Sequence, residues 1–193
     1  MELSEVIQNR RSIGKLSDEV PDKKVIEALL EAARWAPNHY RTEPYSFIVL
    51  SGDGRDKLGD VYGRINIEGL DPSASEEEKE EAYHTGIKKA HRAPYIIVVR
   101  VEPSTLSKVV FAEEIASTAC AVQNILLTAT DLGLGAIWRS GAPSYHPFMK
   151  EAFNVSEEGL VLGYVYVGYP AIEPKAPNKR TVSDMVQWID SKE

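Results

Sequence analysis

The spacing of hydrophobic residues changes along the chain, and these changes predict a series of helices and strands. The near-continuous β-branched run YIIVVRV at 95–101 predicts a central strand that is buried on both faces. Three further strands are expected at 46–51, at the apolar residues after the glycine turn in LGLGAIW, and at 160–170. Helical periodicity predicts helices at 3–10, 22–35, 113–131 and 145–153, a poorly patterned helix within 52–70, and a charged helix ending at Ala93 and Pro94.

These elements describe one α+β domain that covers residues 1–193. We expect a mixed central sheet of about four or five strands wrapped by helices. The helix at 113–131 has small and apolar residues all round, so it is expected to be buried on most sides, in the core of a monomer or at the centre of a dimer. The segment 178–189 could form a short helix or an arm packed on a neighbouring chain.

Charge and cysteine content exclude several classes of function. The formal net charge is -7, and an acidic surface repels phosphate backbones, so no nucleic-acid partner is expected. The one cysteine, Cys120, excludes an internal disulfide and lies in an apolar run, where a buried, inert thiol is expected. No signal peptide is apparent, and no apolar run approaches the roughly 20 residues that a membrane span needs. A cytoplasmic protein without membrane contact is therefore expected.

Several common catalytic motifs are missing from the sequence. The glycines at 133–135 lack the third glycine and the downstream acid of a dinucleotide fingerprint, and they precede a strand. There is no Walker loop and no G-x-S-x-G elbow, and the four histidines are not expected to form a metal site. Hydrolysis and phosphoryl transfer therefore lack the residues that they require.

Three polar clusters lie in apolar surroundings. NRRS at 9–12 offers two guanidinium groups and a hydroxyl to one phosphate, although cations at a helix C-terminus also simply suit its dipole. WAPNHYRTEP at 35–44 includes Asn38 and His39, which could serve only to cap a turn. IWRSG at 137–141 places an arginine at the end of a buried strand, where it must be paired or solvated.

Read in order, five segments resemble the nitroreductase family of flavoproteins: NRRSIGKL, ARWAPNHYRTEPYSFIVL, HRAPYIIVV, CAVQNILLTATDLGLGAIWRSG and LVLGYVYVGYP. The similarity runs from about residue 4 to 170 and is greatest to a compact bacterial branch of NAD(P)H nitroreductases. It implies a nitroreductase-like fold and an intertwined, obligate homodimer with two FMN molecules at the subunit interface. It also implies ping-pong transfer of two electrons from NADH or NADPH to nitroaromatics, quinones or related small-molecule acceptors.

The resemblance also implies which residues hold the phosphate end of FMN. Arg10, Arg11 and Ser12 match the motif that grips the FMN phosphate and ribityl chain. Trp35 and His39 match positions that contact FMN from the partner subunit.

The resemblance also implies contacts with the isoalloxazine end of FMN, and contacts made by the C-terminal segment of the chain. Trp138, Arg139 and Ser140 match the segment that passes the isoalloxazine ring, with the backbone N–H of Ser140 or of its neighbour Gly141 facing N5. The basic pair that closes on the phosphate in many members corresponds to Lys179 and Arg180.

Two positions depart from the family pattern. Glu43 stands where the wider family has glutamine, and Gly14 stands where many members carry a lysine near the flavin pyrimidine edge. A positive charge at that edge would stabilise the charge that develops on reduction, and Arg139 or Arg11 could supply it. Hydride transfer depends mainly on positioning, so no catalytic side chain and no metal are expected.

Three alternatives stay open at this stage. A specialised relative could act on a different acceptor, such as an enoyl or halogenated aromatic compound. A flavin-binding protein could sense or store FMN without useful turnover. A plain interaction domain would bind no cofactor at all.

Overall fold

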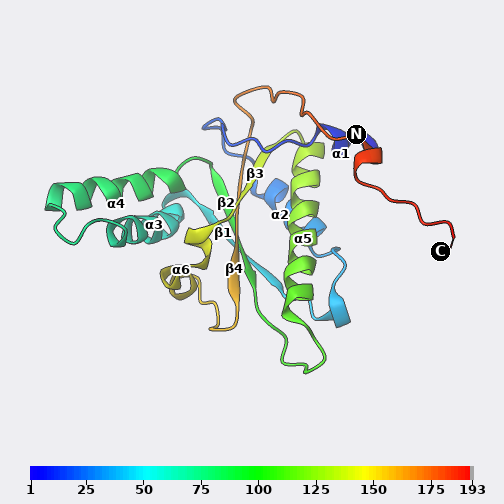
Figure 1. The fold of residues 1–193 in the computed structure, drawn as a ribbon. Helices are drawn as coiled ribbons and strands as arrows, with labels where there is room; N and C mark the ends of the chain where they lie inside the picture. Colours follow the sequence, from blue (N-terminus) through cyan, green and yellow to red (C-terminus); the bar gives the residue numbers. More distant parts are fainter. Residues whose placement is uncertain (192–193) are drawn as a thin grey trace.

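The computed structural model describes residues 1–191, which form an antiparallel sheet with helices on both faces (Figure 1). Its four strands are β1 (Tyr45–Ser51), β2 (Tyr95–Val101), β3 (Gly135–Arg139) and β4 (Leu160–Gly168), in the order β1-β2-β4-β3. The expectation of a mixed sheet is wrong for these strands, because each neighbouring pair is antiparallel. β2 and β3 run in the same direction, but β4 lies between them and pairs with both.

The helices lie close to the predicted segments. They are α1 (Leu3–Asn9), α2 (Lys23–Ala33), α3 (Asp56–Glu68), α4 (Glu76–Ala90), α5 (Phe111–Asp131) and α6 (Pro147–Ala152), with 3-10 turns at His39–Arg41, Gly52–Arg55, Ala142–Tyr145 and Val182–Asp184. A capping box between Ser75 and Glu78 starts α4. The helix expected at 145–153 is shorter because Pro147 occupies its first position and a 3-10 turn precedes it.

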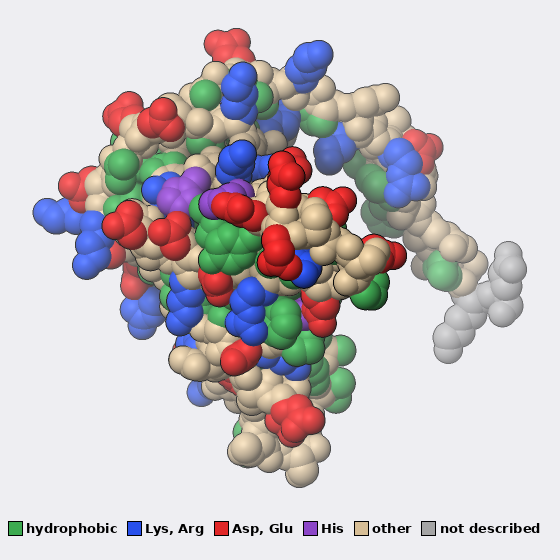
Figure 2. Space-filling view, turned by 90° about the vertical axis from the view of Figure 1, so that its left-hand side faces the viewer, with side chains coloured by type: hydrophobic (Ala, Val, Ile, Leu, Met, Phe, Trp, Pro, Cys, Tyr) green, Lys and Arg blue, Asp and Glu red, His purple; other side chains and the backbone are tan. Residues whose placement is uncertain are grey.

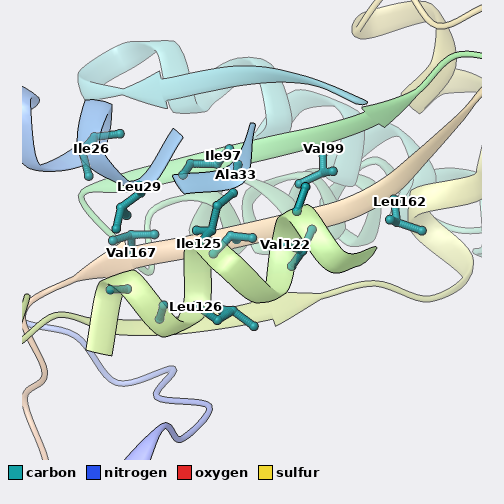
Figure 3. Packing of buried hydrophobic residues seen from close by; sticks show 14 of the residues in the cluster. Ile26, Leu29, Ala33, Ile97, Val99, Val122, Ile125, Leu126, Leu162 and Val167 are labelled. Atoms are coloured by element: carbon teal, nitrogen blue, oxygen red, sulfur yellow. The ribbon is translucent and has the colours of Figure 1, made fainter. Parts of the chain in front are cut away.

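Both faces of the sheet are covered, which explains the continuous apolar runs in its central strands. On one face, Ile97 and Val99 of β2 pack against α2 and α5. Figure 3 shows this layer, with Leu29, Ala33, Val122, Ile125 and Val167 among its labelled members. On the other face, Ile96 and Val98 pack with residues of α3 and α6. Successive side chains of β2 point to opposite faces of the sheet, so this strand contributes apolar residues to the hydrophobic cores on both faces.

Helix α5 is buried on one face only. Val122, Ile125 and Ala129 face the sheet, whereas Ala116 and Cys120 are exposed on the opposite side. The expectations of a helix buried on most sides and of a buried thiol are thus wrong for the single chain. This exposed outer stripe carries the small residues Ala112, Ala116 and Cys120 beside the polar residues Glu113 and Gln123.

The chain after β4 leaves the body as an exposed arm (Figures 1 and 2). Over 171–191 it contains one 3-10 turn, so the short helix expected as one alternative for 178–189 is limited to Val182–Asp184, and packing of this arm on a neighbouring chain stays a prediction. Trp188 and Ile189 are 82% and 79% exposed. No helix within residues 1–191 is long and apolar enough to cross a membrane.

Helices α3 and α4 cross at two glycines. A Cβ added to Gly86 would overlap the backbone N and Cα of Gly63, because the two helices touch there through their main chains. Neither glycine has a positive φ, so close packing explains them and backbone conformation does not.

We expect Gly86→Ala to destabilise the protein by roughly 1–3 kcal/mol, since the backbone that it meets cannot move aside without separating the helices. Urea unfolding measures the change. Gly54→Ala is the matched control, because a Cβ there meets nothing within 4 Å. Equal stability of the two variants would contradict the close packing of α3 on α4.

Candidate active site

The NRRS segment lies along the outer edge of β3. Helix α1 ends at Arg10, whose backbone turns to an extended conformation while its N–H still donates to the Val6 carbonyl at 2.9 Å. The chain then forms a bridge between Ser12 and Ala136, and the Ile13 N–H donates to the Ala136 carbonyl at 2.9 Å. The first and third polar clusters of the sequence are therefore neighbours.

The two arginines of this segment are held differently. Arg11 donates to the carbonyls of Gln8 and Arg10, and its Nε donates to the Lys175 carbonyl at 3.4 Å. It thereby ties the end of α1 to the start of the arm. The half-buried Arg10 side chain makes no hydrogen bond to another residue within 1–191, so its donors are available to an anion.

A bulge in β4 positions the end of β3. The register between β2 and β4 shifts at Val99, leaving Leu162 without a partner, and the Leu162 carbonyl accepts a 3.3 Å hydrogen bond from the Trp138 indole. Gly163 has φ +138°, and a Cβ there would overlap the carbonyl O of Arg139. Only glycine permits this conformation and this close approach, so it holds Trp138 and Arg139 in place.

The guanidinium of Arg139 lies between β4 and residue 14. Its Cζ is 5.6 Å from the centre of the Tyr166 ring, and its Nε is buried without a hydrogen-bond acceptor in the described chain. A Cβ built on Gly14 would stand 2.9 Å from Nη2 of Arg139. The Arg139 guanidinium is therefore a positive group that no carboxylate within residues 1–191 neutralises.

Buried tyrosines surround this end of the sheet. Burial raises the pKa values of Tyr62, Tyr164 and Tyr166, and nearby positive charge from Arg139 and Arg92 opposes only part of the rise at Tyr166. Their hydroxyls therefore stay protonated near neutral pH and cannot act as bases.

The turn after β3 leaves two backbone donors free. Ser140 is exposed, and Gly141 has φ 111°, which favours glycine. Neither N–H donates to another residue within 1–191 outside the strand ladder, while the Gly141 carbonyl accepts from Ser144 N–H at 2.9 Å.

Trp35 and His39 lie elsewhere in the chain. Trp35 follows α2 and is 75% exposed, and the His39 N–H donates to Ser117 Oγ in the N-terminal half of α5 at 3.4 Å. Helix α1 contacts the other end of α5, where the N-terminal amine pairs with Asp131 at 2.8 Å. Ser117 and Asp131 are roughly 21 Å apart at 1.5 Å per residue. Within one chain, His39 therefore lies at the opposite end of α5 from the end that α1 contacts.

The loop that carries His39 is strained. Tyr40, Arg41 and Glu43 have φ values of 51°, 57° and 46°, a region that residues other than glycine rarely adopt. The Asn38 side chain accepts from the Glu43 N–H at 3.1 Å and helps to hold this shape. Such strain persists where surrounding contacts enforce it and is concentrated at functional sites.

Lys179 and Arg180 lie on the exposed arm, and neither makes an ion pair or hydrogen bond within residues 1–191. The start of the arm is anchored near the NRRS segment by a 3.0 Å bond from the Ala171 N–H to the Lys15 carbonyl. The reach of the basic pair to a phosphate stays a prediction.

Sequence reasoning did not single out Tyr166 and did not connect Gly14 with Arg139. The alternation in YVY places Tyr164 and Tyr166 on one face of β4, which was a usable signal. No spacing rule links position 14 to position 139.

Comparison with known proteins confirms the resemblance drawn from the sequence. The model described as "Nitroreductase family" matches residues 7–169. The chain is 31% identical over 190 residues to "Putative NAD(P)H nitroreductase YdjA" of Escherichia coli (strain K12), with 98% of each covered.

Solved structures share the fold. The "Nitroreductase-like Family Protein" from Bacillus cereus aligns with a TM-score of 0.82 and 27% identity, covering 99% of this chain and 97% of that chain. A "Nitroreductase with Bound FMN" from Bacteroides fragilis aligns with a TM-score of 0.70 and 22% identity, covering 98% and 100%. From the family match over most of its length, and from an α+β fold shared with these structures, the chain belongs to the nitroreductase family.

Proposed function

We propose that the protein is an FMN-dependent oxidoreductase that transfers two electrons from NAD(P)H to a nitroaromatic, quinone or related acceptor by a ping-pong mechanism. The observation that carries this proposal is the pairing of the NRRS segment with β3, which brings the available donors of Arg10 and the guanidinium of Arg139, whose Nε is unpaired, to the same edge of the sheet. The names of the relatives and the FMN-bound nitroreductase of the same fold support it.

The residues fit a ligand with a phosphate at one end and a flat ring at the other. Arg10, Arg11 and Ser12 would hold the phosphate and ribityl chain through charge-assisted hydrogen bonds. The free N–H groups of Ser140 and Gly141 would donate hydrogen bonds to the reactive edge of the ring. When bound, FMN supplies the redox chemistry by accepting two electrons and a proton and passing them on.

The chain itself would act by positioning and electrostatics. Because the buried tyrosines stay protonated, they supply no base, and the reaction requires none. The work of the protein is to bind the ring, orient it and leave one face open to NAD(P)H and then to the acceptor.

The same proposal requires a homodimer. Trp35, Trp188 and Ile189 are large apolar side chains that are 75%, 82% and 79% exposed in the single chain, and a partner subunit would cover such surface. In a symmetric pair, Trp35 and His39 of one subunit would complete the site of the other, and the arm would bring Lys179 and Arg180 toward the phosphate.

Purified protein supplied with FMN should be yellow after removal of free FMN, and anaerobic NADH or NADPH should bleach it. Absorbance spectroscopy measures both steps. Colourless protein would indicate an interaction domain, and yellow protein that neither nucleotide bleaches would indicate a flavin sensor or store. Turnover assays across nitroaromatic, quinone and enoyl acceptors would then identify the acceptor class.

Arg10→Ala should weaken FMN binding by about 1.5–3 kcal/mol through the loss of a charge-assisted bond to the phosphate. That loss corresponds to roughly a 10- to 150-fold higher Kd in a fluorescence titration. Lys23→Ala, which removes an exposed cation at the start of α2, is the control and should bind FMN normally. Unchanged affinity of Arg10→Ala would remove Arg10 from the site.

Sharing of the site between subunits predicts complementation. One chain carries Arg10→Ala and the other carries Trp35→Ala with His39→Ala. Random pairing of the two co-expressed chains should restore about a quarter of the FMN sites, because each mixed dimer rebuilds one intact site. The control is each variant expressed alone. FMN content no higher than in these controls would mean that each site lies within a single chain.

A further inference from the structure

Arg139 is an unusual cation for the end of a strand. Its Nε is fully buried and finds no acceptor, and no carboxylate within residues 1–191 pairs with the guanidinium. An unpaired, partly buried charge costs stability, so a fold that retains one gains no structural benefit from the charge itself. The charge instead suits a ligand group that becomes negative.

The position of this guanidinium is closely determined. The Trp138 indole bond to the Leu162 carbonyl and the close approach of Gly163 hold the end of β3. The ring of Tyr166 lies below the guanidinium at 5.6 Å, a distance at which the ring face attracts a cation.

Gly14 provides the space that the guanidinium occupies. Its φ lies outside the left-handed region, so its backbone does not require glycine. A Cβ there would be 2.9 Å from Nη2 of Arg139 and 3.6 Å from Ile137 Cδ1. Any side chain at position 14 would therefore compete with Arg139 for the same volume.

Arg11, the other candidate cation, points away from this volume. Its guanidinium donates to the carbonyls of Gln8, Arg10 and Lys175. Arg139 is thus the arginine whose donors remain free beside the segment that follows Ser12.

We propose that Arg139, lodged in the space left by Gly14, is the cation that faces the pyrimidine edge of FMN and raises its reduction potential. The inference rests on the proposed function. Two electrons and one proton from NAD(P)H, which leaves as NAD(P)⁺, add one net negative charge to the ring. A fixed guanidinium stabilises that charged form more than the neutral oxidised form, and this difference raises the potential.

Arg139→Met and Arg139→Lys, both loaded with FMN, test the role of the charge. Arg139→Met should weaken binding of reduced FMN relative to oxidised FMN by about tenfold or more, which lowers the midpoint potential by about 30 mV per tenfold. Arg139→Lys should keep most of the wild-type potential. A wild-type potential in Arg139→Met, or an equal loss of affinity for both redox states, would overturn the proposal.

Gly14 provides an independent test. Gly14→Ala should lower the potential by displacing the guanidinium, and Gly54→Ala, in open space, should not. In the double variant Gly14→Lys with Arg139→Met, the new ammonium should return the potential toward the wild-type value. If Arg139→Met no longer binds FMN, the test rests on the midpoint potential of Gly14→Ala. A wild-type potential in Gly14→Ala would then overturn the proposal.

The apo-protein separates this role from a structural one. Because the guanidinium has no partner in the chain, apo Arg139→Met should melt no lower than apo wild type. A large loss of thermal stability with an unshifted potential would make Arg139 a structural residue. Failure of the wild-type protein to bind FMN would contradict the proposed function itself, whereas binding with an unshifted potential contradicts only the role of Arg139.

Discussion

The candidate site depends on the pairing of an extended N-terminal segment with the edge of β3. Helix α1 stops at Arg10 because the backbone becomes extended there, and the bridge from Ser12 to Ala136 then places the segment against the strand. This contact joins residues that lie far apart in the family-matched region 7–169. Without it, the phosphate-binding candidates and Arg139 would have no common location, so the local switch from helix to strand-like backbone determines the geometry of the site.

The elements of the fold were largely readable from periodicity, but their arrangement was not. The run at 95–101 predicted β2 correctly because burial on both faces requires apolar residues at every position. The antiparallel character of the sheet was missed, since it depends on β4 inserting between β2 and β3, and side-chain period carries no information about strand order. The burial of helix α5 was predicted wrongly for the single chain, because the small residues Ala116 and Cys120 suit both a buried and an exposed position.

The segments of the candidate site could be identified from the sequence, but the contacts between them could not. The resemblance identified NRRS and IWRSG, and the structure brings them together. It could not show that Gly14 and Arg139 compete for one volume, because that relation exists only after β3 has paired. Trp35 and His39 were expected to act from a partner subunit, and the position of His39 at the opposite end of α5 from α1 is compatible with that expectation.

The strand order also has a consequence for the timing of folding. β3 joins the sheet only through β4, so residues 135–139 lack a strand partner until residues 160–168 have been synthesised and have docked. The Ser12 bridge, which needs β3 in place, spans most of the chain and closes a long loop. During synthesis the N-terminal segment therefore cannot complete its pairing with a docked β3 before residues 160–168 have emerged.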